Sequence, residues 1–131
     1  MPADSWGAGM SPLAKYTGLA YDFVTRNCWQ HVRNVRADAG LQTPEFGCHD
    51  VCGIAEAFES GHADSKGLIM AMQPHDFDAV LMATEKRGRL IWHAGVYHDG
   101  MVSHCDRWAR QVIMEPLSAL RDRYERVEFW R

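Results

Sequence analysis

Residues 89–105 have the sequence RLIWHAGVYHDGMVSHC, and this stretch decides the fold class. Two runs rich in β-branched and aromatic residues lie on either side of Asp99-Gly100. This dipeptide favours the type I′ turn because both positions tolerate a positive φ. The pattern predicts an antiparallel hairpin of strands 89–98 and 101–105.

The two-residue turn also predicts which residues face each other across the hairpin. It aligns Gly95 with His104 and His93 with Asp106, and it puts all four residues on one face. Gly95 has no side chain, which leaves space for His104 to lean toward His93. Asp106 is the competing partner of His93, and the sequence leaves the choice between the two open.

Residues 28–39 give the strongest helix signal, upstream of the hairpin. Asn27 is a good N-cap, Gln30 follows three residues later as in a capping box, and Gly40 supplies a stop. Apolar residues at helical spacing share a face toward the core, namely Cys28, Val32, Val35 and Ala39. The charged residues are expected to lie in water, namely Arg33, Arg36 and Asp38. Cys28 therefore lies in the first helical turn, facing the core.

The other elements are predicted from shorter signals. They are a helix over 48–60, a buried strand over 77–82, a strand around 111–114, a helix over 117–124 and a strand over 126–130. Residues 1–15 are expected to pack loosely, and the arginine-rich residues 121–126 to form a solvated helix face. Helices first and antiparallel strands afterwards indicate an α+β domain rather than a doubly wound one.

Length and composition fit one soluble globular domain over residues 1–131. A net charge of −3 supplies no basic surface for a nucleic-acid backbone. No uncharged stretch approaches the length of a membrane-spanning helix, and the first residues lack the pattern of a secretory signal. We therefore expect neither nucleic acid nor a membrane as a partner.

The cysteines are expected to be free thiols, because a chain without a secretory signal meets a reducing compartment by default. They are Cys28, Cys48, Cys52 and Cys105. Cys28 differs from the others because the dipole and free N–H groups of a helix start favour the thiolate. A nucleophile of this kind needs an imidazole base and a third group that orients the base. Cys28, His93 and His104 can fill these roles in that order.

The cysteines allow two other interpretations. Cys28 could be an ordinary buried residue. Cys48 and Cys52 could bind zinc together with His49, Cys105 or His104. A C-x₃-C on a helix lacks the usual knuckle spacing, however, and there is no second clean pair. We therefore expect no metal and no cofactor.

Several segments together resemble the NlpC/P60 cysteine peptidases, particularly the compact versions found with phage tails. Residues 27–33 (NCWQHVR) are similar to the motif in which the family's cysteine begins a helix. Residues 93–97 (HAGVY) are similar to its H-V-G-I-Y strand, and His104 matches the histidine ending the next strand. Tyr21, in residues 16–21 (YTGLAY), matches a tyrosine that lines the family's cleft. Residues 74–82 and 127–131 resemble the segments that enter the first strand and close the sheet.

The resemblance implies a papain-like α+β fold in which the helix bearing Cys28 packs on an antiparallel sheet. It implies an endopeptidase that cuts peptidoglycan stem peptides, at a D-glutamyl to diamino acid bond, through a thioester. Cys28, His93 and His104 would be catalytic, and Tyr21 would contact the substrate or the oxyanion. The chain would be made in the cytoplasm, associate with phage tail proteins, and act at the bacterial cell wall.

The sequence departs from the family's pattern in three places. Gln30 and His31 replace the usual Gly and Leu, the link between Tyr21 and Cys28 is contracted, and residues 48–70 match no family segment. One alternative is an amidase of the related CHAP type, with Asp106 in place of His104 as the orienting group. Another is a non-catalytic tail or wall-binding module that keeps the fold. If His104 orients His93, activity should fall in mild acid, because two charged imidazoles repel each other.

Overall fold

The structure, a computed structural model, describes residues 11–45 and 68–131. The helices and strands of these residues follow one another along the chain. They are the 3₁₀ helix η1 (Pro12–Tyr16), helix α1 (Cys28–Asp38), strands β2 (Met70–Ala71), β3 (Ala79–Lys86), β4 (Arg89–His98), β5 (Met101–Asp106) and β6 (Gln111–Pro116), helix α4 (Leu117–Arg123) and strand β7 (Arg126–Trp130). The predicted α+β class is confirmed. The predicted helix over 48–60, with Cys48, Cys52 and His49, lies outside the described residues.

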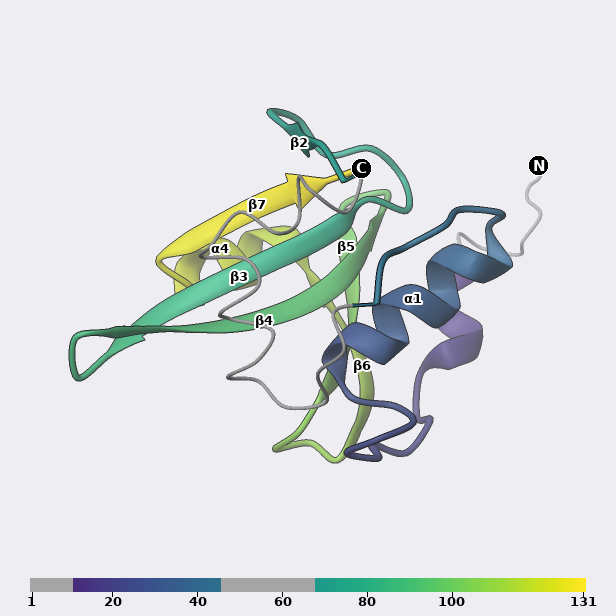
Figure 1. The fold of residues 1–131 in the computed structure, drawn as a ribbon, viewed down its shortest axis with the longest axis horizontal. Coiled ribbons are helices and arrows are strands. Elements are labelled where there is room, and N and C mark those ends of the chain that lie inside the picture. The colour runs from purple at the N-terminus through teal and green to yellow at the C-terminus, as the bar shows by residue number, and fades with distance from the viewer. Residues whose placement is uncertain (1–10, 46–67) are drawn as a thin grey trace.

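The strands form one antiparallel sheet in the order β2-β7-β3-β4-β5-β6. The strand last in sequence, β7, lies between β2 and β3, whereas β3 to β6 follow one another as neighbours. Figure 1 shows α1 on one face of this sheet and α4 on the opposite face. The two helices therefore cover opposite faces of the same sheet.

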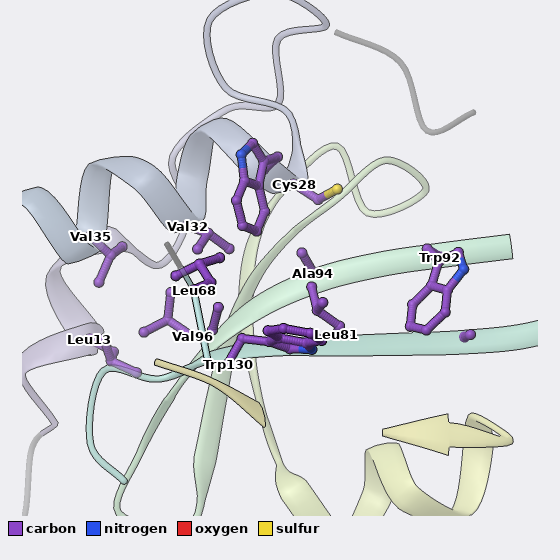
Figure 2. Close-up of a cluster of buried hydrophobic side chains, with 13 residues drawn as sticks. Leu13, Cys28, Val32, Val35, Leu68, Leu81, Trp92, Ala94, Val96 and Trp130 are labelled. Atoms are coloured by element: carbon purple, nitrogen blue, oxygen red, sulfur yellow. The ribbon is translucent and has the colours of Figure 1, made fainter. Parts of the chain in front are cut away.

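Alternation along β3 divides the buried residues into two clusters, one on each face. Its odd-numbered residues pack under α1 with Trp29, Val32 and Val35. The even-numbered Val80 and Met82 pack with Leu120 of α4 on the other face. Figure 2 shows the α1 cluster, in which Leu13 and Trp130 also take part. Leu13 is fully buried, so the expectation of loose packing is wrong for this part of the N-terminal segment.

Helix α1 starts where the sequence predicted. The Asn27 side chain accepts a hydrogen bond from the Gln30 N–H at 2.9 Å, so it caps the helix that begins at Cys28. Arg36 is a correction, because only 3% of it is exposed although the helical pattern put it in water. Its guanidinium donates to the Thr43 hydroxyl at 2.8 Å and to the Phe77 carbonyl at 2.6 Å. The loop after α1, at Thr43, and the turn before β3, at Phe77, therefore cover Arg36.

The strand predicted over 77–82 begins and ends later than expected, as β3. Phe77 has a φ of 70°, which extended chain does not adopt. The Asp78 carboxylate accepts from the His75 N–H at 2.8 Å and from the Arg131 guanidinium at 2.7 Å. These contacts make residues 75–78 a turn, and the strand continues to Lys86 because β4 pairs with it that far.

Candidate active site

The predicted hairpin of β4 and β5 is confirmed. Asp99 and Gly100 have φ values of 46° and 84°, as a type I′ turn requires. Backbone pairing between the strands runs from the turn to Val96 and Ser103. Beyond this pair β5 stays bonded to β6 alone. His93 and Asp106, expected to be directly opposite, thus lie where β4 and β5 have separated.

Gly95 lies at the point of separation, in close contact with β5. A Cβ atom built on Gly95 would lie 2.7 Å from Val102 Cγ1, 2.9 Å from the Ser103 carbonyl oxygen and 3.1 Å from His104 Cβ. Two of these three neighbours are within distances that real Cβ atoms do not show. The space predicted beside Gly95 is therefore already occupied by β5.

We expect Gly95→Ala to destabilise the protein by about 1–3 kcal/mol, the usual cost of overpacking a filled site. Urea unfolding of both proteins measures the difference. Gly88 has a positive φ, which strains any other residue there, so Gly88→Ala is not a suitable control. Ala94→Gly, one residue away from Gly95, measures the separate effect of removing a methyl group from β4. A Gly95→Ala protein as stable as the wild type would show that β5 can move away without cost.

The two histidines of the hairpin are hydrogen-bonded to each other. His93 Nε2 lies 2.8 Å from His104 Nδ1, and the two rings are nearly perpendicular, with an interplanar angle of 82°. Asp106, the competing partner, instead accepts a hydrogen bond from the Ala109 N–H at 2.8 Å and closes the turn after β5. Of the two candidates, His104 is therefore the hydrogen-bond partner of His93.

Two further residues, which the sequence analysis missed, extend this pair. His104 Nε2 lies 2.8 Å from Glu115 Oε1. Arg123 donates to both carboxylate oxygens of Glu115, at 2.8 and 3.0 Å. Arg123 was expected to point into water from α4, and although half exposed it forms this paired contact. The pairing of β5 with β6 aligns Val102 with Glu115, which puts Glu115 on the face of His104, and only that long-range register could have revealed it.

The charges around His104 fix the protons on this chain of contacts. Arg123 is the main cause that lowers the pKa of Glu115 to about 2, so this carboxylate is ionised at neutral pH. Burial lowers the pKa of His104 and of His93, so both imidazoles are neutral there. An ionised carboxylate only accepts hydrogen bonds, so His104 donates through Nε2 and accepts at Nδ1. His93 then donates through Nε2, and the lone pair of its neutral ring is on Nδ1.

Cys28 begins α1 and is buried. Tyr21 and Cys105 interact with it electrostatically. Burial raises the pKa of the Tyr21 hydroxyl, and the nearby Cys28 raises it further. Burial likewise raises the pKa of Cys105 to about 12, with Cys28 as the next cause. The structure thus brings Tyr21 close to Cys28.

Cys28 and the imidazole pair approach β4 from different faces. Figure 2 shows Cys28 at the start of α1, above Ala94 and Trp92 of β4. His93 lies between these two residues in sequence and alternates to the other face. There it pairs with Met82, which packs with Leu120 of α4. Its ring stacks on Tyr124 with centroids 6.4 Å apart. Direct contact of Cys28 with His93 stays a prediction.

The first turn of α1 nevertheless lies close to the imidazole pair. His31 is only 1% exposed. Its Nε2 lies 2.9 Å from the Ser103 hydroxyl, at the last backbone pair of β4 and β5. Burial lowers the pKa of His31 to about 4, and His104 contributes to that shift. The backbone pairing of β4 and β5 ends at Ser103.

Comparison with known proteins adds no family name, since no protein-family model and no curated protein matches the chain. Among the described residues, no helix is long and apolar enough to cross a membrane.

Proposed function

We propose that the protein is a cysteine endopeptidase of the NlpC/P60 type, with Cys28 as nucleophile, His93 as base and His104 as orienting residue. The observation that carries this proposal is the aligned chain of contacts from Glu115 through His104 to His93. It fixes the tautomer of His93 and directs a basic nitrogen, Nδ1, away from its partners. This is the task of the orienting group in nucleophile–base pairs.

The reaction begins with transfer of the Cys28 thiol proton to His93 Nδ1. The sulfur attacks the carbonyl carbon of the scissile amide, and His93 then donates the proton to the leaving amine. A thioester results, which water hydrolyses with His93 again acting as base. The first step requires the sulfur to turn toward His93 where β4 and β5 are separate.

Stabilisation of the oxyanion falls to groups around Cys28. N–H groups in the first turn of a helix have no partner within the helix, and they point toward the charge that develops at the carbonyl oxygen. Tyr21 offers a hydroxyl whose raised pKa keeps it protonated and able to donate. Loss of one such donor typically costs on the order of 10²-fold in rate.

Glu115 and Arg123 make His104 a better orienting group than a lone imidazole. With Nε2 donating to an ionised carboxylate, the Nδ1 lone pair of His104 is fixed toward His93. Protonation of His104 would replace that lone pair with a second donor and break the alignment. Activity is therefore still expected to fall with acid, but burial moves the fall below the usual pKa of an imidazole.

The substrate part of the proposal is the stem peptide of peptidoglycan, cut between D-glutamate and a diamino acid, with action at the cell wall as part of a phage tail. It rests on the motifs in residues 27–33 and 93–97. The CHAP-type amidase is less well supported, because Asp106 is engaged by Ala109 while His104 contacts His93.

Digestion of purified peptidoglycan, followed by mass spectrometry of the released fragments, tests this function. We expect fragments with a new free amine on the diamino acid, and none after the thiols are blocked. Release of whole stem peptides from the sugar would identify an amidase. Unchanged peptidoglycan, with a folded protein and unblocked thiols, would leave the non-catalytic module as the function.

A further inference from the structure

Side chains of His93, His104 and Asp106 bring possible metal-ligand atoms close together. One nitrogen from each ring and one carboxylate oxygen all lie within 4.8 Å of one another. We propose that these three residues bind a divalent transition-metal ion, with Zn²⁺ as the best match to the donor set. Two imidazoles and a carboxylate form a recognised zinc donor set, with a fourth position left for water.

The site forms when the two rings separate and the Asp106 carboxylate moves toward them. Zinc binds nitrogen and oxygen donors at about 2.0–2.2 Å, so donor atoms of a tetrahedral site lie about 3.4 Å apart. His93 Nε2 and His104 Nδ1 are 2.8 Å apart, and a slight separation admits the ion between them. Asp106 uses one oxygen for the Ala109 N–H, and the other is available as a ligand.

A carboxylate already supports one of the ligands from outside. Metal-binding histidines usually donate their second ring N–H to a carboxylate, which fixes the ring and makes its other nitrogen a stronger donor. Glu115 does this for His104 at 2.8 Å. His104 is almost fully buried, so its orientation is also fixed by packing. The lone pair on His104 Nδ1 is thus directed toward the proposed ion.

Metal binding would switch off the proton relay. When the ion takes the Nε2 lone pair of neutral His93, the ring proton must be on Nδ1, and Nδ1 can no longer accept a proton from a thiol. The ion also replaces the hydrogen bond between the two rings. Zn²⁺ is therefore an inhibitor of hydrolysis, a consequence that rests on the proposed function, whereas binding itself does not.

Binding is tested with Co²⁺ and Zn²⁺ on the full chain, kept reduced and without substrate. We expect the visible bands of four-coordinate Co²⁺, without a thiolate charge-transfer band, and displacement of Co²⁺ by Zn²⁺. Asp106→Asn should weaken Zn²⁺ binding at least tenfold while its amide oxygen still accepts from Ala109. The matched control is Asp76→Asn, since Asp76 also lies beside a histidine, His98 at 3.7 Å, and should bind as the wild type does.

Two results would overturn the metal site. One is equal Zn²⁺ affinity of Asp106→Asn and wild type. The other is a thiolate band that disappears in Cys48→Ser or Cys52→Ser, which would assign the ion to the cysteines. The outcomes also separate the two proposals. Tight binding together with no hydrolysis by the metal-free protein supports the metal site and contradicts the peptidase. Hydrolysis by the metal-free protein together with equal Zn²⁺ affinity of Asp106→Asn and wild type supports the peptidase and contradicts the metal site.

Discussion

Replacement of Cys28 by alanine is expected to lower the rate of stem-peptide hydrolysis by about 10³-fold or more, because covalent catalysis then has no nucleophile. The rate is measured as release of free amine from a synthetic stem peptide. Alkylation provides a second measurement. A thiol activated by a helix start and an imidazole should react with iodoacetamide below the pH at which an ordinary thiol does.

Cys105→Ala is the matched control for this experiment. Cys105 is the other cysteine among the described residues, and it is also buried. Its sulfur donates to the Arg26 carbonyl at 3.1 Å, and burial raises its pKa to about 12, so it is a poor nucleophile. We expect Cys105→Ala to hydrolyse the peptide within a few-fold of the wild-type rate. Hydrolysis that survives in Cys28→Ala and is lost in Cys105→Ala would show that Cys105, and not Cys28, is the nucleophile.

Mild acid is expected to destabilise the fold strongly, because the fold buries histidines such as His31 in the neutral form. An unfolded histidine has the usual pKa of about 6.5, whereas burial lowers the pKa of folded His31 to about 4. Between these values the unfolded state binds a proton that the folded state does not. The stability is therefore fully present above the unfolded pKa and is lost as the pH falls toward 4, by about 3 kcal/mol for this residue. His93 and His104 shift in the same direction and add to the loss.

Urea unfolding at pH 7 and at pH 4.5 measures this loss. In His31→Gln the amide can still bond the Ser103 hydroxyl, and the fall in unfolding free energy should be smaller by up to ~1.4 kcal/mol per pH unit. His75→Gln is the control for the loss of an imidazole, since His75 is exposed. If His31→Gln loses as much stability in acid as the wild type does, another group must cause the acid lability.

Elements with strong local signals were predictable from the sequence. The Asp99-Gly100 turn and the Asn27 cap each depend on residues within a few positions, and both are as expected. The strand over 126–130 is also confirmed as β7. What failed depends on residues far apart in the chain. Arg36 is covered by a turn near Phe77, a contact that no helical pattern contains.

The candidate site shows the same division. The pairing of His93 with His104 follows from the hairpin and Gly95, whereas Glu115 and Arg123 join it through β6 and α4, whose positions the hairpin does not determine. The alternation along β4 could be predicted, but the face that α1 would cover could not. Cys28 and His93 were therefore expected on the same face of the sheet, whereas they lie on opposite faces.

The position of β7 has a consequence for shortened forms of the chain. Because β7 pairs with the whole inner half of β3, from Ala79 to Ala83, it covers a row of backbone groups in the most buried strand. Removal of residues 126–131 would turn β3 into an uncovered sheet edge, and such an apolar edge is a template for pairing with other chains. A truncation before Arg126 should therefore aggregate rather than remain as a smaller folded monomer.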